Sequence, residues 1–325
     1  MSISLNDIRK PFKAELMAYE DTFKSIMASN VKLIDTVVKY IVKNKGKGLR
    51  PLLAIMSAKL VGEPVKNTYI VASIVELLHT ASLVHDDVVD DAELRRGFPS
   101  INAIWKNKIA VLMGDYMLSK CLISATMTDS LQIMQLLADA SRRLSKGELL
   151  QIEKSRKMTI TEEDYFQIIS DKTAALIYTS SLLGALTTSD NPDDHNNMKN
   201  FGENLGIAFQ IKDDLLDYYG TQLITGKPTG NDFKDKKITL PLIAAFTKAE
   251  EKEIKKIKKM LKKGVSGKEI KYIINFVEQY GGIEYATHKQ NEYAEKAKKC
   301  LDTYPNSEVK SAMVSFVDFT INRSK

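Results

Sequence analysis

Long apolar segments with few interruptions dominate the pattern of hydrophobic and polar positions. The run IVASIVELLHTASLVHDDVV, from Ile70 to Val89, is apolar on almost every side and too long for a strand. It predicts a helix buried at the centre of the molecule. Residues 108–126 and 201–219 have the same character. Pro51, which is followed by LLAIMSAKL, predicts another helix that begins at the proline itself.

Breaks between these segments are few. Glycine and proline together supply 16 and 8 of the 325 residues, below their usual share of roughly 12%. Loops are expected only at residues 62–67, 93–102, 188–200 and 219–237. No repeat, low-complexity linker or shift of composition divides the chain. We therefore expect an all-α fold with one domain over residues 1–325, a large antiparallel helical bundle with its site between facing helices.

Composition and charge exclude several classes of protein. The chain has 47 Lys and Arg against 41 Asp and Glu, a net charge of +6, and no stretch interleaves clustered basic residues with aromatic ones. No nucleic-acid partner is expected. Cys121 and Cys300 have neither metal-binding spacing nor the number that a disulfide framework needs. The polar start MSISLNDIRKPFKAE and the absence of a run of ~18 apolar residues predict a cytoplasmic protein without a transmembrane segment.

An acidic cluster ends the central helix, in the segment ASLVHDDVVDDAELRRG. Helix positions i and i+4 lie above one another, so Asp86 should pair with Asp90, and Asp87 with Asp91. Carboxylates paired in this way repel unless a cation lies between them. Mg²⁺ suits such a site, because it takes carboxylate oxygens and completes its shell with water and substrate phosphate. A solvated acidic helix end is the alternative, and the apolar turns before the cluster argue against it.

A second cluster repeats the pattern in FQIKDDLLDYY. Asp213 and Asp217 are again four residues apart, Asp214 lies beside them, and Gln210 precedes them by about one turn. One such motif is weak evidence, but two on apolar helices are strong evidence that facing helices enclose several metal ions. The ligand that several Mg²⁺ ions and basic side chains would share is a diphosphate.

Basic residues accompany both clusters. Any one of them alone would be an ordinary surface residue, but arginine grips phosphate in a bidentate fork and a helix N-terminus favours an anion. The residues are Lys47 and Arg50 in KGKGLRP, Arg95 and Arg96 after the first cluster, and Lys227 and Lys237 in GTQLITGKPTGNDFKDKK after the second.

Together these motifs resemble the trans-type (all-E) isoprenyl diphosphate synthases, over roughly residues 45–241, and the long-chain polyprenyl branch most of all. The motifs are KGKGLRP, ELLHTASLVHDDVVDDAELRRG, LMGDYML, KGELLQ, DKTAAL, and GIAFQIKDDLLD with GKPTGNDFKDKKITLP. The resemblance implies antiparallel helices around a deep central cavity, and a homodimer. It also implies head-to-tail (1′-4) condensation of isopentenyl diphosphate onto an allylic diphosphate, with farnesyl diphosphate as the expected primer.

The resemblance also implies a role for each site residue. Mg²⁺, three ions in the family, would be bound by Asp86, Asp90 and Asp213, with Asp87, Asp214 and Asp217 as outer partners or occasional ligands. The allylic diphosphate would be bound by Arg95, Lys172, Lys227 and Lys237, and isopentenyl diphosphate by Lys47, Arg50, His79 and Arg96. Thr173 and Gln210 would stabilise the allylic cation, and His85, Glu148 and Gln151 are expected to be structural or supporting residues.

Two small side chains bear on the length of the product. Ser82 and Ala81, four and five residues before the first motif, are small and would leave the product tunnel open, which implies a product longer than C20, of about C30–C40. A helical wheel places Ser82 about 40° from Asp86 and Ala81 about 140° away, so geometry supports Ser82 alone.

Residues 45–48 read KGKG where the family has GGKR. Restoring arginine at Gly48 is expected to strengthen isopentenyl diphosphate binding or leave it unchanged.

Several alternatives remain open from sequence alone. A short-chain synthase would share every motif, whereas a class I terpene cyclase would lack the second aspartate cluster and a non-catalytic subunit would commonly lose one cluster. A helical metal scaffold would not need the basic residues. The lysine-rich run EKEIKKIKKMLKKG, Glu251–Gly264, is expected to be a solvated helix face, with peripheral membrane contact as the alternative.

Overall fold

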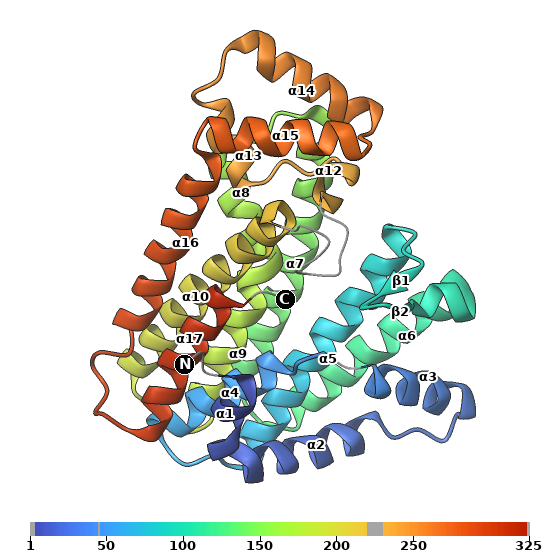
Figure 1. Cartoon of the computed structure of the whole chain (residues 1–325). Helices are drawn as coiled ribbons and strands as arrows, with labels where there is room; N and C mark the ends of the chain where they lie inside the picture. The colour runs from blue at the N-terminus through green and yellow to red at the C-terminus, as the bar shows by residue number, and fades with distance from the viewer. Residues whose placement is uncertain (1–3, 45, 220–229, 324–325) are drawn as a thin grey trace.

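The computed structural model describes residues 4–44, 46–219 and 230–323, and this part of the chain is helical nearly throughout, as the pattern predicts (Figure 1). The first half contains α1 (Leu5–Arg9), η1 (Lys10–Phe12), α2 (Lys13–Met27), α3 (Lys32–Lys43), α4 (Leu49–Val61), α5 (Lys66–Val89), α6 (Ile101–Thr126) and α7 (Leu131–Lys157). The second half contains α8 (Glu162–Ile169), η2 (Ser170–Ala174), α9 (Ala175–Leu186), α10 (Pro192–Tyr219), α12 (Asn231–Lys234), α13 (Leu240–Phe246), α14 (Glu251–Lys263), α15 (Gly267–Gln279), α16 (Gly282–Lys299) and α17 (Glu308–Asn322).

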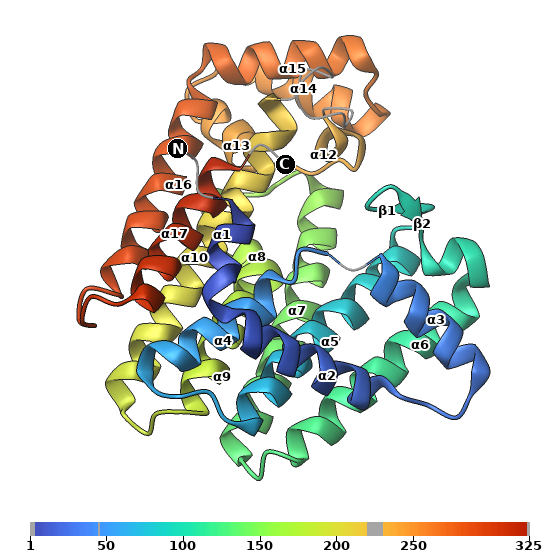
Figure 2. The same ribbon diagram turned by 60° about the horizontal axis from the view of Figure 1, so that its bottom comes forward.

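Helices α4, α5, α9 and α10 form the centre of the bundle. α5 packs against α4, α6 and α9, and α10 packs between α9 and α16. α2 lies across α4 and α5 at one end of the molecule, while α14 and α15 lie at the opposite end (Figures 1 and 2). The two helices that carry the aspartate clusters, α5 and α10, are therefore both internal elements, joined through α9.

Burial explains why these helices are apolar on every side. All residues from Ala175 to Ala185 in α9 are buried, and so are those from Ile70 to Leu78 in α5 except Glu76. The buried hydroxyls of Thr179 and Ser180 donate to the backbone carbonyls four residues earlier, at 2.7 Å each. These two hydroxyls are thus satisfied within their own helix.

Some features of the helices differ from the sequence prediction. α4 begins at Leu49, so Pro51 lies at the third helical position, where the backbone still lacks an intrahelical acceptor. The loop expected at 188–200 is helical from Pro192, because proline at the start and Asp193 and Asp194 in the first turn favour a helix N-terminus. α6 includes a break at Lys106, whose φ is 70°.

A short hairpin occupies part of the loop expected at 93–102. β1 (Leu94–Arg95) pairs antiparallel with β2 (Phe98–Pro99), with Arg95 opposite Phe98. The turn residues Arg96 and Gly97 both have positive φ, 56° and 81°, as a two-residue type I′ turn requires. This turn fixes the direction of Arg96, one of the predicted diphosphate ligands.

Two described helices, α5 and α6, are long and apolar enough to cross a membrane by length and composition alone. In the most apolar 18-residue stretch of each helix, 61% is buried inside the protein for α5 and 39% for α6. Core packing therefore accounts for α5. α6 retains an exposed apolar row of Ile104, Val111, Leu112, Leu122 and Ile123.

A buried ionic cluster fixes η2, a π-helical turn, against α7 and α10. Arg143 on α7 donates from Nε to Asp171 at 2.9 Å and from Nη2 to Glu203 on α10 at 3.1 Å and to the carbonyl oxygen of Ser170 at 3.0 Å. Burial alone would raise the pKa of Asp171, but hydrogen bonds from Gln167, Arg143 and Lys146 lower it below its ordinary value. This cluster holds the turn that carries Lys172 and Thr173.

Removing the arginine from this cluster should destabilise the fold. Arg143→Met removes one of the two cations that pair with the buried Asp171 and also the cation that pairs with Glu203, so we expect a loss of about 3 kcal/mol in the free energy of unfolding at pH 7, measured by urea denaturation. The loss should begin to shrink as the pH falls below about 4, where the unfolded carboxyl takes up a proton, and should disappear as the pH passes through the lowered pKa of folded Asp171. The neighbouring Arg142→Met removes an exposed pair with Asp139 and should cost less than about 1 kcal/mol. Equal losses in both variants would contradict the assignment.

Candidate active site

The first aspartate cluster lies at the end of α5. Asp86 is half-buried in the last helical turn, and Asp90 is the exposed C-cap residue. Asp91 has a positive φ of 48° and lies beyond the helix. The expected pairing of Asp87 with Asp91 on one helix face is therefore wrong, because α5 ends at Val89, before that turn is complete.

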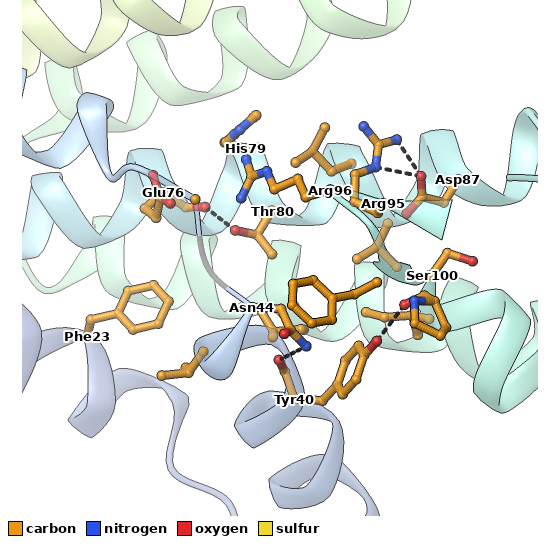
Figure 3. Close-up of a pocket in the computed structure, with 18 of the residues that line it drawn as sticks. Phe23, Tyr40, Asn44, Glu76, His79, Thr80, Asp87, Arg95, Arg96 and Ser100 are labelled. Atoms are coloured by element: carbon orange, nitrogen blue, oxygen red, sulfur yellow. Dashed lines mark hydrogen bonds and ion pairs between the residues drawn. The ribbon is translucent and has the colours of Figure 1, made fainter. Parts of the chain in front are cut away.

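Asp87 is bound within the protein. Its side chain is buried, and its Oδ1 accepts hydrogen bonds from Arg95, from Nε at 2.8 Å and also from Nη2 (Figure 3). This pair attaches the hairpin to α5. Arg95, predicted to bind a diphosphate, is therefore already neutralised by Asp87 in this state.

Asp86 faces residues from two other elements. Burial raises its pKa to about 6, Lys172 of η2 and Arg95 lower it, and Glu148 of α7 and Asp90 raise it. Lys172 in turn forms an ion pair with Glu148 and lies 3.4 Å from Gln151 Oε1. α5, α7 and η2 thus bring an acidic and a basic group to one place. Glu148 and Gln151, expected to be supporting residues, are the partners of Lys172.

A chain of hydrogen bonds positions the two uncharged candidates. Thr173 donates to Gln210 Oε1 at 2.7 Å, and Gln210 Nε2 donates to Asp214 Oδ1 at 2.8 Å. The other oxygen of Asp214 accepts from the buried Tyr165 hydroxyl at 2.6 Å. Asp214 is buried, which raises its pKa. It therefore orients Gln210 and Thr173, as an outer partner would.

The other two aspartates of the second cluster face different partners. Asp213 accepts a hydrogen bond of 2.6 Å from Arg323, and Asp217 Oδ2 accepts one of 3.0 Å from the backbone N–H of Asp232. Burial and then the charge of Asp217 raise the pKa of Asp232 to about 7. Asp232 thus extends this cluster to a fourth carboxylate.

Sequence reasoning missed both Asp232 and Arg323. Asp232 lies in GNDFKDKK, where an acidic residue inside a basic loop was a usable signal. Arg323 follows α17, and no motif marks it. Its side chain is only 9% exposed, its guanidinium carbon lies 3.9 Å from the centre of the Phe209 ring, and its Nε is buried with no hydrogen-bond partner in the described residues.

Lys237 connects the two clusters. Burial would lower its pKa, but Asp235, Asp232 and, from the first cluster, Asp90 raise it above the ordinary value. A single ammonium group therefore lies within electrostatic reach of both aspartate clusters. Lys227, the other predicted lysine of this loop, lies outside the described residues.

Arg50, His79 and Arg96 form a cationic group beside the second cluster. Burial, and to a smaller extent the charge of Arg96, lower the pKa of Arg50 to about 10 against the opposing charges of Glu76 and Asp213. Its Nε is buried without a hydrogen-bond partner in the described residues. Burial and the charges of Arg50, Arg96 and Arg95 keep the pKa of His79 well below its ordinary value. A neutral imidazole among guanidinium groups, one with an orphaned donor, is a site that fits an anion.

The backbone around this cationic group depends on glycine. A Cβ on Gly46 would lie 2.3 Å from Nη1 of Arg96, so a larger residue there would displace the end of the Arg96 side chain. Gly48 is the N-cap of α4 with φ of 53°, in the left-handed region. Arginine there would be strained in this conformation, so restoring the family residue would cost stability. Lys47 is exposed, with Nζ 5.8 Å from the centre of the Phe319 ring.

His79, Arg95 and Arg96 also border a cavity of about 120 Å³ between α5, the hairpin, α2 and α3 (Figure 3). Much of its lining is apolar, with Phe23 and Phe98 among the residues. It faces the side of α5 that carries Asp87, not the side that carries Asp86.

The remaining predicted positions lie along α5. Ser82 is half-buried and its hydroxyl donates to the carbonyl oxygen of His79 at 2.8 Å. Ala81 is buried in the apolar cluster that joins α5 to α6 and α7. His85 lies 3.3 Å from Asp115 Oδ1, over Gly114, where a Cβ would collide with its ring at 2.2 Å. His85 thus fastens α5 to α6.

Carboxylates that could hold a metal are present, but not as a closed cage. Among the described residues no group of three or more His, Cys, Asp or Glu side chains is placed to hold an ion by itself. Asp86 with Asp90, and Asp213, would each offer one or two oxygens. Such open sets suit Mg²⁺, which keeps several waters and shares substrate phosphates.

Comparison with known proteins agrees with this geometry. A family model described as polyprenyl synthetase matches residues 31–277. The octaprenyl diphosphate synthase of Haemophilus influenzae is 30% identical over 99% of this chain and 98% of its own. A short chain isoprenyl diphosphate synthase of Methanothermobacter thermautotrophicus is 32% identical over 94% of this chain and 95% of its own.

A solved structure extends the likeness to the whole fold. The polyprenyl synthase of Caulobacter crescentus, complexed with calcium and isoprenyl diphosphate, superposes with a TM-score of 0.92, at 30% identity over 100% of this chain and 99% of the other. The chain belongs to the polyprenyl synthetase family of prenyl-transferring enzymes.

Proposed function

We propose that this enzyme adds isopentenyl diphosphate head-to-tail (1′-4) onto an allylic diphosphate, with farnesyl diphosphate as primer, and repeats the step to make an all-E polyprenyl diphosphate of about C30–C40. The observation that carries the proposal is that the Arg50, His79 and Arg96 group lies beside Asp213, with Lys237 within electrostatic reach of both carboxylate clusters. One diphosphate would bind between the carboxylates, and the other at the arginines, beside it.

Divalent cations complete the first of these sites. We propose Mg²⁺, as three ions, held by Asp86, Asp90 and Asp213 together with the substrate's phosphate oxygens. The open carboxylate sets fit this role, and the related Caulobacter crescentus structure contains calcium with isoprenyl diphosphate. When bound, the cations would neutralise the diphosphate and so make it a better leaving group.

The chain's own residues divide the remaining work. Lys172 and Lys237 would bind oxygens of the allylic diphosphate and stabilise the charge that develops on it. Thr173 and Gln210, oriented by Asp214, would direct their oxygen dipoles at the allylic carbon as it gains positive charge. Arg50, His79 and Arg96 would hold isopentenyl diphosphate. No side chain is an obvious base, so the departing diphosphate would take the proton.

The length of the product, about C30–C40, is a separate and more detailed part of the proposal. Its support is the small side chain of Ser82, half-buried one turn before Asp86 on a similar face of α5. The short-chain relative is as similar to this chain as the octaprenyl relative is. A short-chain synthase is therefore the second candidate function.

We also propose a homodimer. Its support is the exposed apolar row on α6, which continues onto α7 through Leu131, Met134 and Leu149, with exposed fractions between 37% and 69%. A second copy covering this row would remove its apolar side chains from contact with water, as happens at the interfaces of obligate dimers.

Metal dependence gives the first test of the reaction. EDTA should abolish incorporation of labelled isopentenyl diphosphate and Mg²⁺ should restore it. Asp86→Asn and Asp213→Asn should each lower kcat by more than ~100-fold, because each removes a principal electrostatic stabiliser. Asp139→Asn, at an exposed position on α7, should leave kcat unchanged. Near-normal turnover in either site variant would remove that residue from the metal assignment.

Kinetic constants separate the two diphosphate sites. Arg50→Ala should raise the KM for isopentenyl diphosphate by ~10-fold or more, since it removes a charge-assisted hydrogen bond of about 1.5–3 kcal/mol. The KM for farnesyl diphosphate should change little, and Arg156→Ala, at an exposed position on α7, should change neither. A rise confined to the farnesyl diphosphate KM would reverse the assignment of the two sites.

Chromatography of dephosphorylated products tests chain length. The wild type should release products longer than C20, and Ser82→Phe should shorten them towards C15–C20, because the added ring would block the path beside Asp86. Ala81→Tyr is a poorer probe, since the buried site would be overpacked at a cost of about 1–3 kcal/mol. Ser311→Phe on the exposed face of α17 controls for added bulk. A wild type that stops at C15 or C20 would favour the short-chain candidate.

A further inference from the structure

The lysines of α14 are concentrated at one end of the molecule. This 13-residue helix contains seven lysines and two glutamates, a net charge of +5, whereas the whole chain carries +6. α14 and α15 lie together at the end of the molecule opposite α2 (Figures 1 and 2). Nearly the whole positive excess of the protein is therefore presented on one short surface helix.

Packing explains the apolar positions of α14 but not its charge. Ile257 and Leu261 are fully buried in the cluster they share with α13 and α15. The apolar stripe of the helix is thus used by the protein's own core, so α14 cannot insert into another apolar phase. Its lysines are left facing outward, and six of the seven are exposed.

Most of these lysines lack an acidic partner. In the described part of the chain, Lys252, Lys259, Lys262 and Lys263 have no carboxylate within ion-pair distance, and Lys255 pairs with Glu251 at 2.7 Å. α16 shows the opposite arrangement: Lys296 pairs with Glu292 at 2.7 Å, and Lys298 pairs with both Glu295 and Asp318. The charge on α14 is therefore available to an external anion.

A shallow hollow with aromatic walls adjoins this charge. Four lysines of α14 line it together with Tyr272 and Tyr280, and Glu250 and Glu253 contribute the opposing charges. Lys256 Nζ lies 3.0 Å from the Tyr272 hydroxyl and 4.2 Å from the centre of its ring. Lysine with tyrosine at a rim is the composition found where proteins meet the headgroup layer of a bilayer.

We propose that α14 docks the enzyme electrostatically on the anionic surface of a lipid bilayer. α14 has no arginine, so it lacks the bidentate fork used for defined phosphate recognition and provides diffuse point charges instead. The choice of a bilayer rests on the proposed function, since a long polyprenyl product is apolar and must leave water. Contact would be peripheral, because the apolar face of the helix stays in the protein.

Vesicle sedimentation tests the surface directly. Sucrose-loaded vesicles of phosphatidylcholine and phosphatidylglycerol at about three to one should bind the protein, and vesicles of phosphatidylcholine alone should not. Each lysine near such a surface strengthens binding roughly five-fold, so replacing Lys252, Lys259, Lys262 and Lys263 by glutamine should weaken binding by at least ~10-fold. Raising the salt from ~0.1 to ~0.5 M should release the wild type.

A matched variant separates the helix from overall charge. Replacing Lys289, Lys296, Lys298 and Lys299 of α16 by glutamine removes the same charge and should change vesicle binding by less than ~2-fold. Equal losses in both variants, no binding by the wild type, or tighter binding to duplex DNA than to vesicles would each overturn the proposal. Prenyl transfer with soluble substrates should be unchanged in the α14 variant. A wild type that binds vesicles but transfers no prenyl group would instead refute the proposed function.

Discussion

Charge placed inside an apolar bundle needs counter-charge, and the arrangement of this site follows from that requirement. Burial is the largest influence on the pKa of Asp86, Arg50 and His79 alike, and in each case it disfavours the charged form. Part of the charge is neutralised internally, through the pairs of Asp87 with Arg95 and of Asp213 with Arg323. The remaining charge lies unbalanced in separate acidic and basic groups. Divalent cations would neutralise the acidic groups, and the polyanion that arrives with them would neutralise the basic ones. Such a site is electrostatically prepared for its ligand before the ligand binds.

Local sequence was enough to locate the buried helices and most of the acidic and basic residues. The apolar run of α5 and the i, i+4 aspartates depend on helix periodicity, which is a local property. Asp91 departs from that pattern because α5 ends two residues before it. The position of a helix end depends on capping and not on periodicity. Residues 192–200 form the first turns of α10 despite their polar composition, because a proline and two aspartates favour a helix N-terminus there.

Other features depend on contacts between distant parts of the chain. Arg323 lies 110 positions from Asp213 in sequence, and neither residue alone marks the partnership. The type I′ turn of the hairpin places Arg96 at positive φ, which the sequence RRG permits but does not require. Overall similarity also leaves product size undetermined: relatives named for long and for short products differ by only two percentage points in identity to this chain. A few side chains along α5 carry that information, and an average over three hundred residues conceals it.

The π-helical turn Ser170–Ala174 gives the chain an unusual sensitivity to length. A π-helical turn contains one residue more than the α-helical turn that it replaces. Losing a residue there would let α8 and α9 continue as one regular helix, but the turn's own contacts would suffer, because Asp171 and Ala174 are buried in it. The positions before and after the lost residue would also rotate relative to each other by about 100°, and Lys172 and Thr173 could no longer both face their present partners on α7 and α10. At this point of the chain, a deletion that a sequence alignment would treat as minor would be more damaging than most substitutions.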